Sequence, residues 1–404
     1  CKFSFMEEWK EYKLGEVVIP VKDRIETSFL DSTSYVSTEN MLPNKAGITL
    51  SSGVPSGSAV KFRYEDILIS NIRPYFKKIW RADRNGGCSA DVICLRASNA
   101  VVPLFLYYLL SQDLFFDYVM QGAKGTKMPR GDRNQIMQWP VLLPSKSEQQ
   151  KIALILSALD DKIEVNKRIN DNLEQQAQAL FKSWFVDFEP FKDGEFVESE
   201  QGMIPNGWRV GTLNELGNIV GGSTPSKAKP EYYTNNGIAW LTPKDLSISQ
   251  RKFTSKGQID ITQEGYDSCS TKLMPKGSVL FSSRAPIGYL TIAKNDICTN
   301  QGFKSVIPKL AGTAFLYCFL KESTQEIENK ATGSTFKEVS GALMKSLPAI
   351  IPEKAILHDF ENLLTPLFYQ QEVVEEENTL LSSLRDSLLP RLMSGELNVS
   401  EINM

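Results

Sequence analysis

This 404-residue sequence has few of the residues and segments that metalloproteins, disulfide-bonded proteins and membrane proteins require. It has a single histidine, and its six cysteines include no Cys-x-x-Cys pair. That spacing argues against a zinc ribbon and fits a reducing compartment. No stretch of eighteen apolar residues occurs, so we expect no conventional transmembrane helix. The first residues, CKFSFMEEWKEYKLGEV, contain no apolar signal-peptide segment, and we therefore expect a cytoplasmic protein.

Motifs of the common enzyme classes are missing as well. There is no GxxxxGKS or GxxxxGKT phosphate loop, no HExxH metal site, no nucleophile elbow and no Asn-Pro-Pro-aromatic run of the amino-methyltransferases. The lone His358 has no catalytic Cys or Asp pattern around it, and we expect it on a helix surface. Because catalysis needs a cluster of suitable residues, we predict that the chain is not an enzyme and has no catalytic residue, metal site or cofactor of its own.

Charge alternates along the chain although the net charge is only −3. Residues 1–144 carry a net +3 and residues 203–352 a net +6, whereas residues 145–202 carry −5 and residues 353–404 carry −7. The two basic segments indicate acidic ligands, and the two acidic segments would be repelled by such ligands.

An internal repeat explains this alternation. DILISNIRP at residues 66–74 resembles SVLFSSRAP at 278–286, and FLYYLL at 105–110 resembles FLYCFL at 315–320. GTKMPRGDRNQIMQWPVLLP at 125–144 likewise corresponds to residues 333–352. The matches keep the same order at a nearly constant offset, which indicates a duplicated unit.

The duplication predicts two homologous modules, each followed by a long helix. Short β-rich runs such as DVICLR and an apolar helix after Pro103 make each module α+β. We place module one at residues 1–144, the first helix at 145–190, a linker at 191–202, module two at 203–352, and the second helix with a tail at 353–404.

Each helix begins directly after a Pro-x-x-x-Pro pair, at residues 140–144 and 348–352. Ser145, with Glu148 three residues later, has the pattern of a capping box. Residues of the first helix then step 4-3-4-3, as in a coiled-coil seam: Ile152, Leu156, Leu159, Ile163, Asn166, Asn170, Leu173, Ala177, Leu180 and Trp184.

The second helix repeats this seam 208 residues later, so Asn378 corresponds to Asn170, whereas Gln371 and Arg385 interrupt its apolar pattern. We predict that the two helices form a long antiparallel coiled coil, about 60 Å in length, related by a pseudo-twofold axis and holding the modules apart. The alternative is that each helix packs only on its own module.

The basic modules favour duplex DNA as ligand, because Lys and Arg that neutralise phosphates release counterions. Gly-Ser-Thr turns offer N–H groups to phosphates, and Arg, Asn and Gln can read base edges, although such turns are often only turns. The predicted DNA-binding residues are Arg73, Lys77, Lys78, Lys124, Thr126, Lys127 and Arg130 in module one, and Ser223, Thr224, Lys227, Ser283, Arg284, Asn300, Gln301, Ser334, Thr335 and Lys337 in module two.

The whole pattern resembles the DNA-specificity (S) subunits of type I restriction-modification systems. The resemblance lies in the two Pro-x-x-x-Pro junctions, in EQQKIALILSALDDKIEVNKRINDNLEQQAQALFKSWFVDF, in NTLLSSLRDSLLPRLMSGEL, and in the GGSTPS, GSVLFSSRAPIGYLTIA and TNQGF motifs of module two. Module one lacks the GGSTPS and NQGF motifs, so its basic loops alone are its candidates.

The resemblance implies two α/β target recognition domains, each reading one half of a bipartite DNA sequence. The helices would set the spacer and dock modification (methyltransferase) subunits, two per chain, with restriction subunits in the larger complex. S-adenosylmethionine and ATP would bind those partners. Half-sites about one helical turn apart, near 10 base pairs, are expected for paired modules.

Apolar residues at the helix ends are the predicted partner-binding surface, because SWFVDF is too apolar to leave exposed: Leu180, Trp184, Phe185, Phe188, Leu388, Leu389 and Leu392. Two alternatives stay open at this point. One is a stand-alone DNA-binding or anti-restriction protein of the same fold, and the other is a coiled-coil scaffold that binds no DNA.

Overall fold

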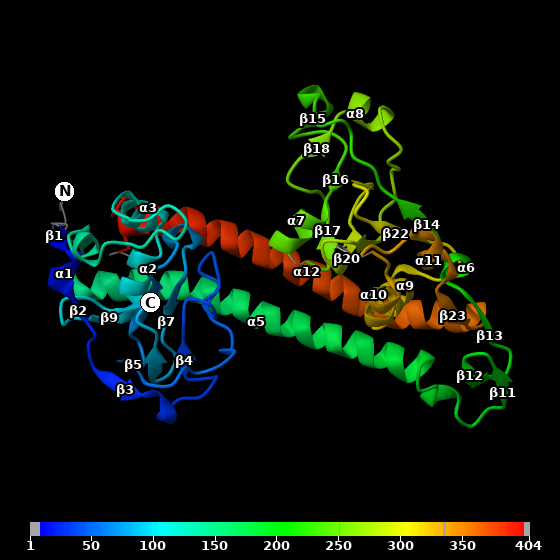
Figure 1. Cartoon of the computed structure of the whole chain (residues 1–404), viewed down its shortest axis with the longest axis horizontal. Helices are drawn as coiled ribbons and strands as arrows, with labels where there is room; N and C mark the ends of the chain where they lie inside the picture. Colours follow the sequence, from blue (N-terminus) through cyan, green and yellow to red (C-terminus); the bar gives the residue numbers. More distant parts are fainter. Residues whose placement is uncertain (1–8, 250, 334–336, 400–404) are drawn as a thin grey trace, which may run out of the picture. The chain divides into compact units, whose positions relative to one another are not determined.

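The computed structural model describes residues 9–249, 251–333 and 337–399. The chain divides into two compact units, residues 1–163 with 380–404 (unit 1) and residues 164–379 (unit 2). Two 40-residue helices, α5 (Lys146–Phe185) and α12 (Lys354–Met393), each contribute one part to unit 1 and the other part to unit 2 (Figure 1). Among the described residues, no helix is long and apolar enough to cross a membrane.

Unit 1 contains two four-stranded sheets. The first has the order β2-β9-β6-β7 and is antiparallel; the second has the order β3-β5-β8-β4 and includes one parallel pair, β4 with β8. The strands of these sheets are β2 (Val18–Pro20), β3 (Arg24–Glu26), β4 (Tyr35–Val36), β5 (Ser58–Phe62), β6 (Ile67–Ser70), β7 (Ile79–Arg81), β8 (Gly86–Cys88) and β9 (Val92–Ala97). A separate two-stranded sheet pairs β1 (Lys10–Lys13) with β10 (Pro140–Leu143).

Helix α2 (Pro103–Leu110) packs against the first of these sheets, and α1 (Leu14–Val17), α3 (Asp113–Gln121) and α4 (Arg133–Ile136) add buried residues to the same core. Pro103 opens α2, where the missing N–H costs nothing. The core of the unit joins the aromatic residues of α2 and α3 to Ile152 and Leu156 of α5 and to Leu392 of α12. The helix pair is therefore part of the core of unit 1.

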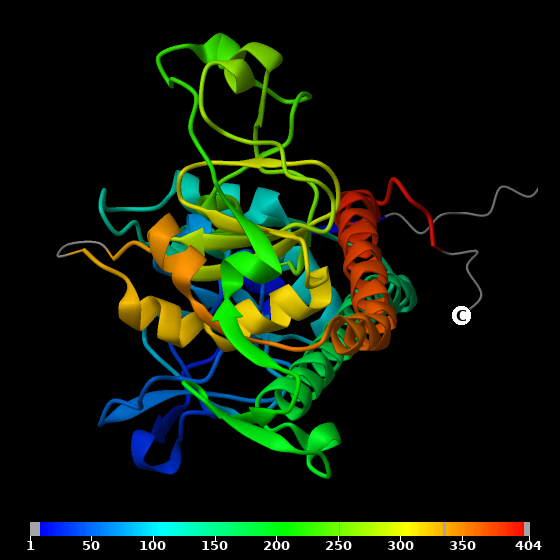
Figure 2. The same ribbon diagram turned by 90° about the vertical axis from the view of Figure 1, so that its right-hand side faces the viewer.

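Unit 2 is built around a five-stranded sheet with the order β14-β22-β19-β20-β17. Helices α9 and α10 pack against this sheet (Figure 2). The sheet strands are β14 (Gly217–Gly221), β17 (Phe253–Thr254), β19 (Val279–Ser283), β20 (Ile287–Ala293) and β22 (Lys304–Pro308), and the helices are α6 (Leu213–Leu216), α7 (Pro243–Ile248), α8 (Gln263–Asp267), α9 (Thr313–Glu322), α10 (Thr324–Lys330) and α11 (Gly341–Ser346).

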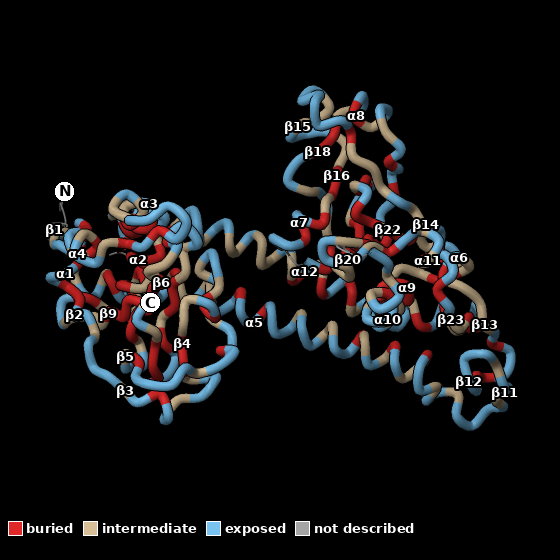
Figure 3. Tube along the Cα trace, viewed as in Figure 1, coloured by how far each residue is buried: buried red, intermediate tan, exposed pale blue. Residues whose placement is uncertain are grey.

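Four strand pairs complete unit 2: β11 (Phe196–Ser199) with β12 (Gly202–Pro205), β13 (Arg209–Thr212) with β23 (Pro348–Ile351), β15 (Tyr233–Thr234) with β18 (Asp260–Ile261), and β16 (Trp240–Leu241) with β21 (Cys298–Thr299). The β11-β12 hairpin overlaps residues 191–202, which the sequence suggested as a linker. In both units the buried residues gather between the sheets and their helices (Figure 3).

The proline pairs lie at equivalent places in the two modules. Pro140 begins β10, which pairs with the first strand of module one, and Pro348 begins β23, which pairs with the first strand of module two. The N–H of Leu14 donates to the carbonyl of Trp139 (2.8 Å), and the N–H of Leu213 donates to that of Leu347 (2.9 Å). Each proline therefore opens a strand that closes its module just before the long helix.

The predicted capping box at the start of α5 is confirmed. The Glu148 N–H donates to the Ser145 hydroxyl and the Ser145 N–H donates to the Glu148 carboxylate, both at 3.3 Å. Together these bonds satisfy two donors that a helix N-terminus otherwise leaves unpaired.

Within unit 2, parts of α5 and α12 lie side by side. Asn166, which is 1% exposed, donates to Glu377 (2.7 Å) and Asn378 (3.0 Å), and Gln371 donates to the carbonyl of Asn170 (3.2 Å). As residue numbers rise along α5 they fall along α12, so the two segments are antiparallel in this unit. The helix segments of this unit pack both on each other and on module two, so packing on a module alone does not describe them.

Candidate nucleic-acid interface

In module one, the structure brings two basic loops together, although more than forty residues separate them in the sequence. The N–H of Arg73 donates to the carbonyl of Pro129 (2.8 Å), and the N–H of Gly131 donates to that of Asn71 (3.2 Å). Lys124 and Arg130 close the second loop through two backbone hydrogen bonds of 2.9 Å. The loops at residues 70–78 and 122–133 thus form one continuous surface, here called the basic surface of module one.

The cationic side chains of this basic surface differ in exposure and in whether they form ion pairs within the chain. Arg73, Thr126 and Lys127 are exposed, and neither Arg73 nor Lys127 has an ion pair with any described residue. Lys124 is 83% exposed but lies 3.1 Å from Asp132, and Arg130 lies 3.3 Å from Asp91. Such exposed pairs contribute at most about 1 kcal/mol, so a phosphate can compete for both cations.

Lys77 and Lys78 are bound more firmly within the module. Lys77 pairs with Asp113 at 3.0 Å, and the ammonium of Lys78 donates to the carbonyl of Thr38 at 2.7 Å. Burial lowers the pKa of Lys78, with a further contribution from nearby Arg73. We therefore rank these two predicted DNA contacts below Arg73 and Lys127, which the structure leaves available.

In module two, the GGSTPS and TNQGF motifs come together. The N–H of Ser223 donates to the carbonyl of Thr299 (3.0 Å), and Thr224 bonds through its hydroxyl to Gln301. The Asn300 side chain accepts from the N–H of Gly302 at 2.9 Å. A Cβ at Gly222 would lie 2.2 Å from the Asn300 carbonyl oxygen, so this close approach requires glycine. Lys227 is exposed a few residues further along the same segment.

The remaining candidates of module two lie around Glu338. Arg284 and Lys304 approach the Glu338 carboxylate at 3.3 and 3.6 Å, and Lys337 is exposed beside it. Ser283 is fully buried, with its hydroxyl 3.4 Å from the Lys304 ammonium, so its burial does not support the expected DNA contact. The predicted residues Ser334 and Thr335 lie outside the described residues.

The predicted partner-binding residues pack within the chain itself, some fully buried and some half-buried. Phe185 is 7% exposed and packs against Phe315 and Phe360, with ring centroids 4.8 Å away in each case. The others join the same kind of cores: Leu180, Trp184 and Phe188 pack in unit 2, and Leu388, Leu389 and Leu392 pack in unit 1. The reason for expecting a partner there was uncovered apolar surface. That reason is weakened for the three buried residues Phe185, Leu389 and Leu392, and partner contact at the whole set stays a prediction.

Sequence reasoning missed the polar cluster that attaches module two to the helix pair, here called the Lys252 anchor. The Lys252 side chain is 4% exposed, and its ammonium donates to Glu174 (2.7 Å) and to Gln371 (2.6 Å). The same ammonium lies 3.3 Å from the ring centroid of Phe368 and 4.3 Å from that of Tyr317. A buried cation is thereby paired, hydrogen-bonded and covered by aromatic faces.

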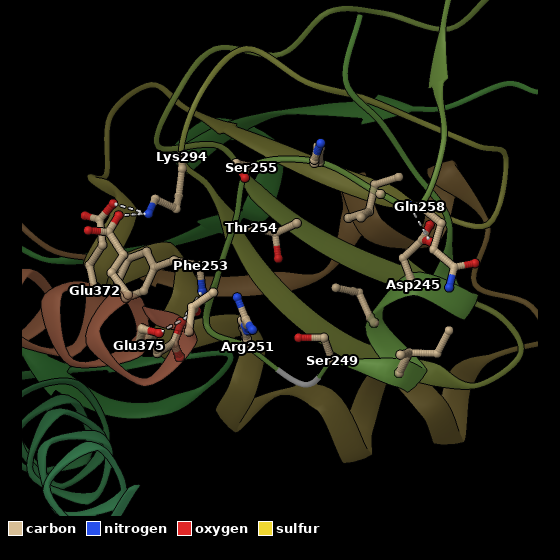
Figure 4. A pocket seen from close by; sticks show the side chains of 17 residues that line it. Asp245, Ser249, Arg251, Phe253, Thr254, Ser255, Gln258, Lys294, Glu372 and Glu375 are labelled. Atoms are coloured by element: carbon tan, nitrogen blue, oxygen red, sulfur yellow. Dashed lines mark hydrogen bonds and ion pairs between the residues drawn. The ribbon is translucent and has the colours of Figure 1, made fainter. Parts of the chain in front are cut away.

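Further contacts extend this attachment along α12 (Figure 4). The Glu375 carboxylate accepts the N–H groups of Lys252 (2.8 Å) and Phe253 (3.2 Å), and Lys294 pairs with Glu372 (3.4 Å) and with Glu376. In the same view, the carboxylate of Asp245 accepts the N–H of Gln258 at 3.0 Å. Phe253, Lys294, Glu372, Glu375 and Glu376 line a cavity of about 360 Å³, so polar contacts add to the apolar packing of Phe253 against Phe368 at this edge of the module.

The electrostatics of the anchor follow from its burial. Burial by itself raises the pKa of Glu174, but the ammonium groups of Lys252 and Lys321 outweigh this effect and lower it to about 2. Burial lowers the pKa of Lys252, and Glu174 opposes that shift. Glu174 is therefore a carboxylate at neutral pH, and its 2.7 Å contact with Lys252 favours the charged form of the ammonium group.

Unit 1 has its own anchor, here called the Asp160 anchor. The hydroxyl of Tyr108 on α2 donates to Asp160 of α5 at 2.7 Å, and Arg385 of α12 donates to the other oxygen of that carboxylate at 2.7 Å. One carboxylate therefore links the module to both helix segments of its unit. Neither anchor has a metal-binding arrangement, and the described residues contain no group of three or more His, Cys, Asp or Glu suited to a metal ion.

Two related α/β modules, each carrying exposed basic loops and each fastened to the same helices, define a two-module nucleic-acid-recognition protein. Comparison with known families agrees with this class. The family model of the type I restriction modification DNA specificity domain matches the chain twice, over residues 6–175 and 205–376. These matches cover most of the sequence, and the chain therefore belongs to the family of type I restriction-modification specificity subunits, whose role is DNA recognition rather than catalysis.

Individual relatives support the assignment along the whole chain. The sequence is 28% identical to the type I restriction enzyme HindI specificity subunit of Haemophilus influenzae, over 97% of this chain and 100% of that protein. It is 38% identical to the MjaIX specificity subunit of Methanocaldococcus jannaschii over 45% of this chain and 44% of that protein. Among solved structures, the S subunit of a type I restriction-modification system from M. genitalium has a similar fold, with a TM-score of 0.60, 17% identity and coverage of 97% of this chain and 98% of that one.

Proposed function

We propose that each module of this specificity subunit reads one half of a bipartite DNA target. The observation that carries the proposal is the basic surface of module one, where two distant loops meet and present Arg73, Lys124, Lys127 and Arg130 together. Module two offers its own set around Asn300 and Gln301. For these modules we keep the predicted bounds, residues 1–144 and 203–352.

We further propose that α5 and α12 act as the spacer of the recognition site. The antiparallel contacts inside unit 2 and the shared Asp160 anchor of unit 1 support a coiled coil with pseudo-twofold symmetry. Because each helix is continuous for 40 residues, it can serve as the rigid element that this proposal requires. The two half-sites would then lie about one helical turn of DNA apart, near 10 base pairs.

Specificity subunits of this class bind DNA and assemble with modification and restriction subunits. For this chain we propose two modification (methyltransferase) subunits docked on the helices, in the cytoplasm, with S-adenosylmethionine and ATP bound by the partner subunits. The acidic charge of residues 145–202 and 353–404 supports a protein partner rather than DNA at the helices. The family match favours this role over the stand-alone DNA-binding protein and the non-DNA scaffold.

The decisive test is the methylated-base map of the source genome with and without this gene. We expect one bipartite motif to lose methylation when the gene is deleted and to regain it on complementation. An unchanged map in a strain that expresses active modification subunits would overturn the proposal.

A second measurement tests the basic surface of module one. Replacing Lys127 with Ala in the assembled complex should weaken binding to target and non-target duplexes alike, and should reduce the slope of log affinity against log salt by about 1. The matched control is Lys309→Ala, an exposed lysine on the loop after β22. An unchanged salt slope would remove Lys127 from the DNA contact.

A further inference from the structure

Strand pairing shows that one segment of module one is equivalent to one segment of module two, although the two sequences are not similar there. In module one, strand β4 runs parallel to β8, pairing Tyr35 with Gly87 and Val36 with Cys88. In module two, β16 runs parallel to β21, pairing Trp240 with Cys298 and Leu241 with Thr299. Strand β8 directly precedes β9, and β21 directly precedes β22, so the two parallel pairs occupy the same place in their modules. Val36 and Leu241 are therefore equivalent residues.

Hydrogen bonds beyond the strand ends confirm this register. The N–H of Ser89 donates to the carbonyl of Val36, and the N–H of Asn300 donates to that of Leu241, both at 2.9 Å. Ser89 of module one therefore occupies the place of Asn300, a predicted base-reading residue of module two. A second pair of hydrogen bonds agrees with this register. The N–H of Asn71 donates to the carbonyl of Asp91 (2.9 Å), and the N–H of Ser283 donates to that of Gly302 (2.7 Å).

A turn follows β4 and the first turn of helix α7 follows β16, and both segments begin with the same kind of backbone-to-side-chain hydrogen bond. The N–H of Ser37 donates to the Asn40 side chain at 2.6 Å, and the N–H of Thr242 donates to the Asp245 side chain at 2.7 Å. The residue just before each capping side chain is Glu39 in module one and Lys244 in module two. Both are exposed, so the same position carries opposite charges in the two modules.

In module one, Glu39 stands at a pocket of about 540 Å³ next to the basic surface. Most of the side chains that line the pocket carry hydroxyl or carboxylate groups, and the lining residues are Tyr35, residues 37–39, residues 51–55, Ser89 and Asp91. Two contacts join the pocket to the basic surface: Lys78 donates to the carbonyl of Thr38 (2.7 Å), and Arg130 pairs with Asp91 (3.3 Å). Hydrogen-bonding groups thus lie directly beside cations suited to phosphates.

The negative charge of the Glu39 carboxylate limits the groups of DNA to which it can bind. A carboxylate repels a phosphate, whereas it accepts hydrogen bonds from the amino groups that cytosine and adenine present in the major groove. Asp91 is already paired with Arg130, but Glu39 has no ion pair with any described residue. A lysine at the equivalent position suits the O6 and N7 acceptors of guanine.

We propose that Glu39 and Lys244 are specificity-determining residues that read opposite base-edge chemistry at the same place in their two half-sites. Glu39 accepts a hydrogen bond from an exocyclic amino group of cytosine or adenine, and Lys244 donates to the acceptor edge of guanine. The inference rests on the proposed function, and it makes the bipartite target asymmetric at this pair of positions.

The test uses the full chain assembled with its modification subunits. Methylation rates are measured on duplexes that carry each of the four bases at every position of each half-site. Glu39→Lys should lower the rate on the native target on the order of 10- to 100-fold, the loss expected for one base contact. It should shift the preferred base at one position of one half-site towards guanine and leave the other half-site unchanged.

Lys244→Glu should produce the mirror result in the other half-site. The controls are Glu11→Lys on β1 and Lys309→Glu after β22, which change charge equally at exposed positions and should alter neither half-site. Thermal unfolding and complex assembly identify variants that fail to fold, and for those Glu39→Ala and Lys244→Ala are used, which should lose discrimination at the same single positions.

Base preferences that stay unchanged in Glu39→Lys, or an equal loss on all sequences, would overturn the inference and leave the proposed function intact. A wild-type complex that methylates no bipartite motif would overturn the proposed function, and the inference with it.

Discussion

The two units attach their modules to the helix pair with polar anchors of different depth. In the Lys252 anchor of unit 2, the Lys252 and Glu174 side chains are 4% and 18% exposed. In the Asp160 anchor of unit 1, the Arg385 and Asp160 side chains are 29% and 31% exposed. Both anchors connect one module to both helix segments, but only the first removes its charges from water.

Because the two ion pairs differ in burial, we expect them to contribute differently to the free energy of unfolding. Breaking a buried ion pair by removing one partner costs several kcal/mol, because the other charge is left uncompensated. An exposed or half-exposed pair contributes little, because water and salt screen it. We therefore expect the orientation of module two to depend on its anchor much more strongly than that of module one.

The largest effect is expected from Lys252→Ala. The change leaves Glu174 buried without its partner, and we expect the free energy of unfolding of unit 2 to fall by about 3–5 kcal/mol. Chemical denaturation of the purified chain measures this loss. Lys256→Ala, at an exposed lysine on the same segment, is the control and should change stability by less than about 0.5 kcal/mol.

A double change sharpens the same comparison. Lys252→Met combined with Glu174→Gln removes both charges, so it should recover part of the loss of the single variant. If the two single effects simply add, the ion pair is not what holds module two to the helices.

A change in pH should alter the free energy of unfolding through Glu174 by about 3 kcal/mol or less. The pKa of Glu174 is about 2 in the folded chain against an ordinary value of 4.5. Its stabilising contribution is therefore fully present above about pH 4.5 and is lost as the pH falls towards 2. Burial raises the pKa values of Glu361 and Glu375, which act in the opposite direction.

The stability of the wild-type chain relative to Glu174→Gln isolates the contribution of Glu174, because Glu361 and Glu375 are common to both proteins. We expect that difference to be largest near pH 7 and to shrink below pH 4.5. A difference that is independent of pH would mean that the Glu174 charge does not stabilise the fold.

The smallest effect is expected in unit 1. Arg385→Ala should lower the free energy of unfolding by about 1 kcal/mol, because the pair with Asp160 is partly exposed. Arg391→Ala, which removes a more exposed pair with Glu396, is the control and should cost less. A loss in Arg385→Ala as large as that in Lys252→Ala would abolish the contrast between the units.

Patterns that recur along the chain made much of the fold predictable. Repetition revealed the two modules, and the proline pairs marked the points at which a strand ends and a helix starts. Ser145 and Glu148 could be identified as a capping box because all of its partners lie within four residues. Local chemistry of this kind can be read directly from the sequence.

Residues whose partners are distant in the sequence were harder to interpret. Gln371 and Arg385 looked like defects of the seam, yet Gln371 bonds to Lys252 and Arg385 to Asp160, more than a hundred residues away. Phe185 looked like a docking residue because the aromatic rings that cover it come from other elements. The equivalence of Glu39 and Lys244 depended on strand register, which no sequence similarity between the modules revealed.

The pairing of the first and last strands of each module has an evolutionary consequence. The chain enters module one along β1 and leaves it along β10, side by side, and it enters and leaves module two along β13 and β23 in the same way. A segment whose two ends adjoin can be exchanged as a cassette without redirecting the flanking chain. Recombination at these paired strands could therefore give a new protein a new target while its long helices stay as they are.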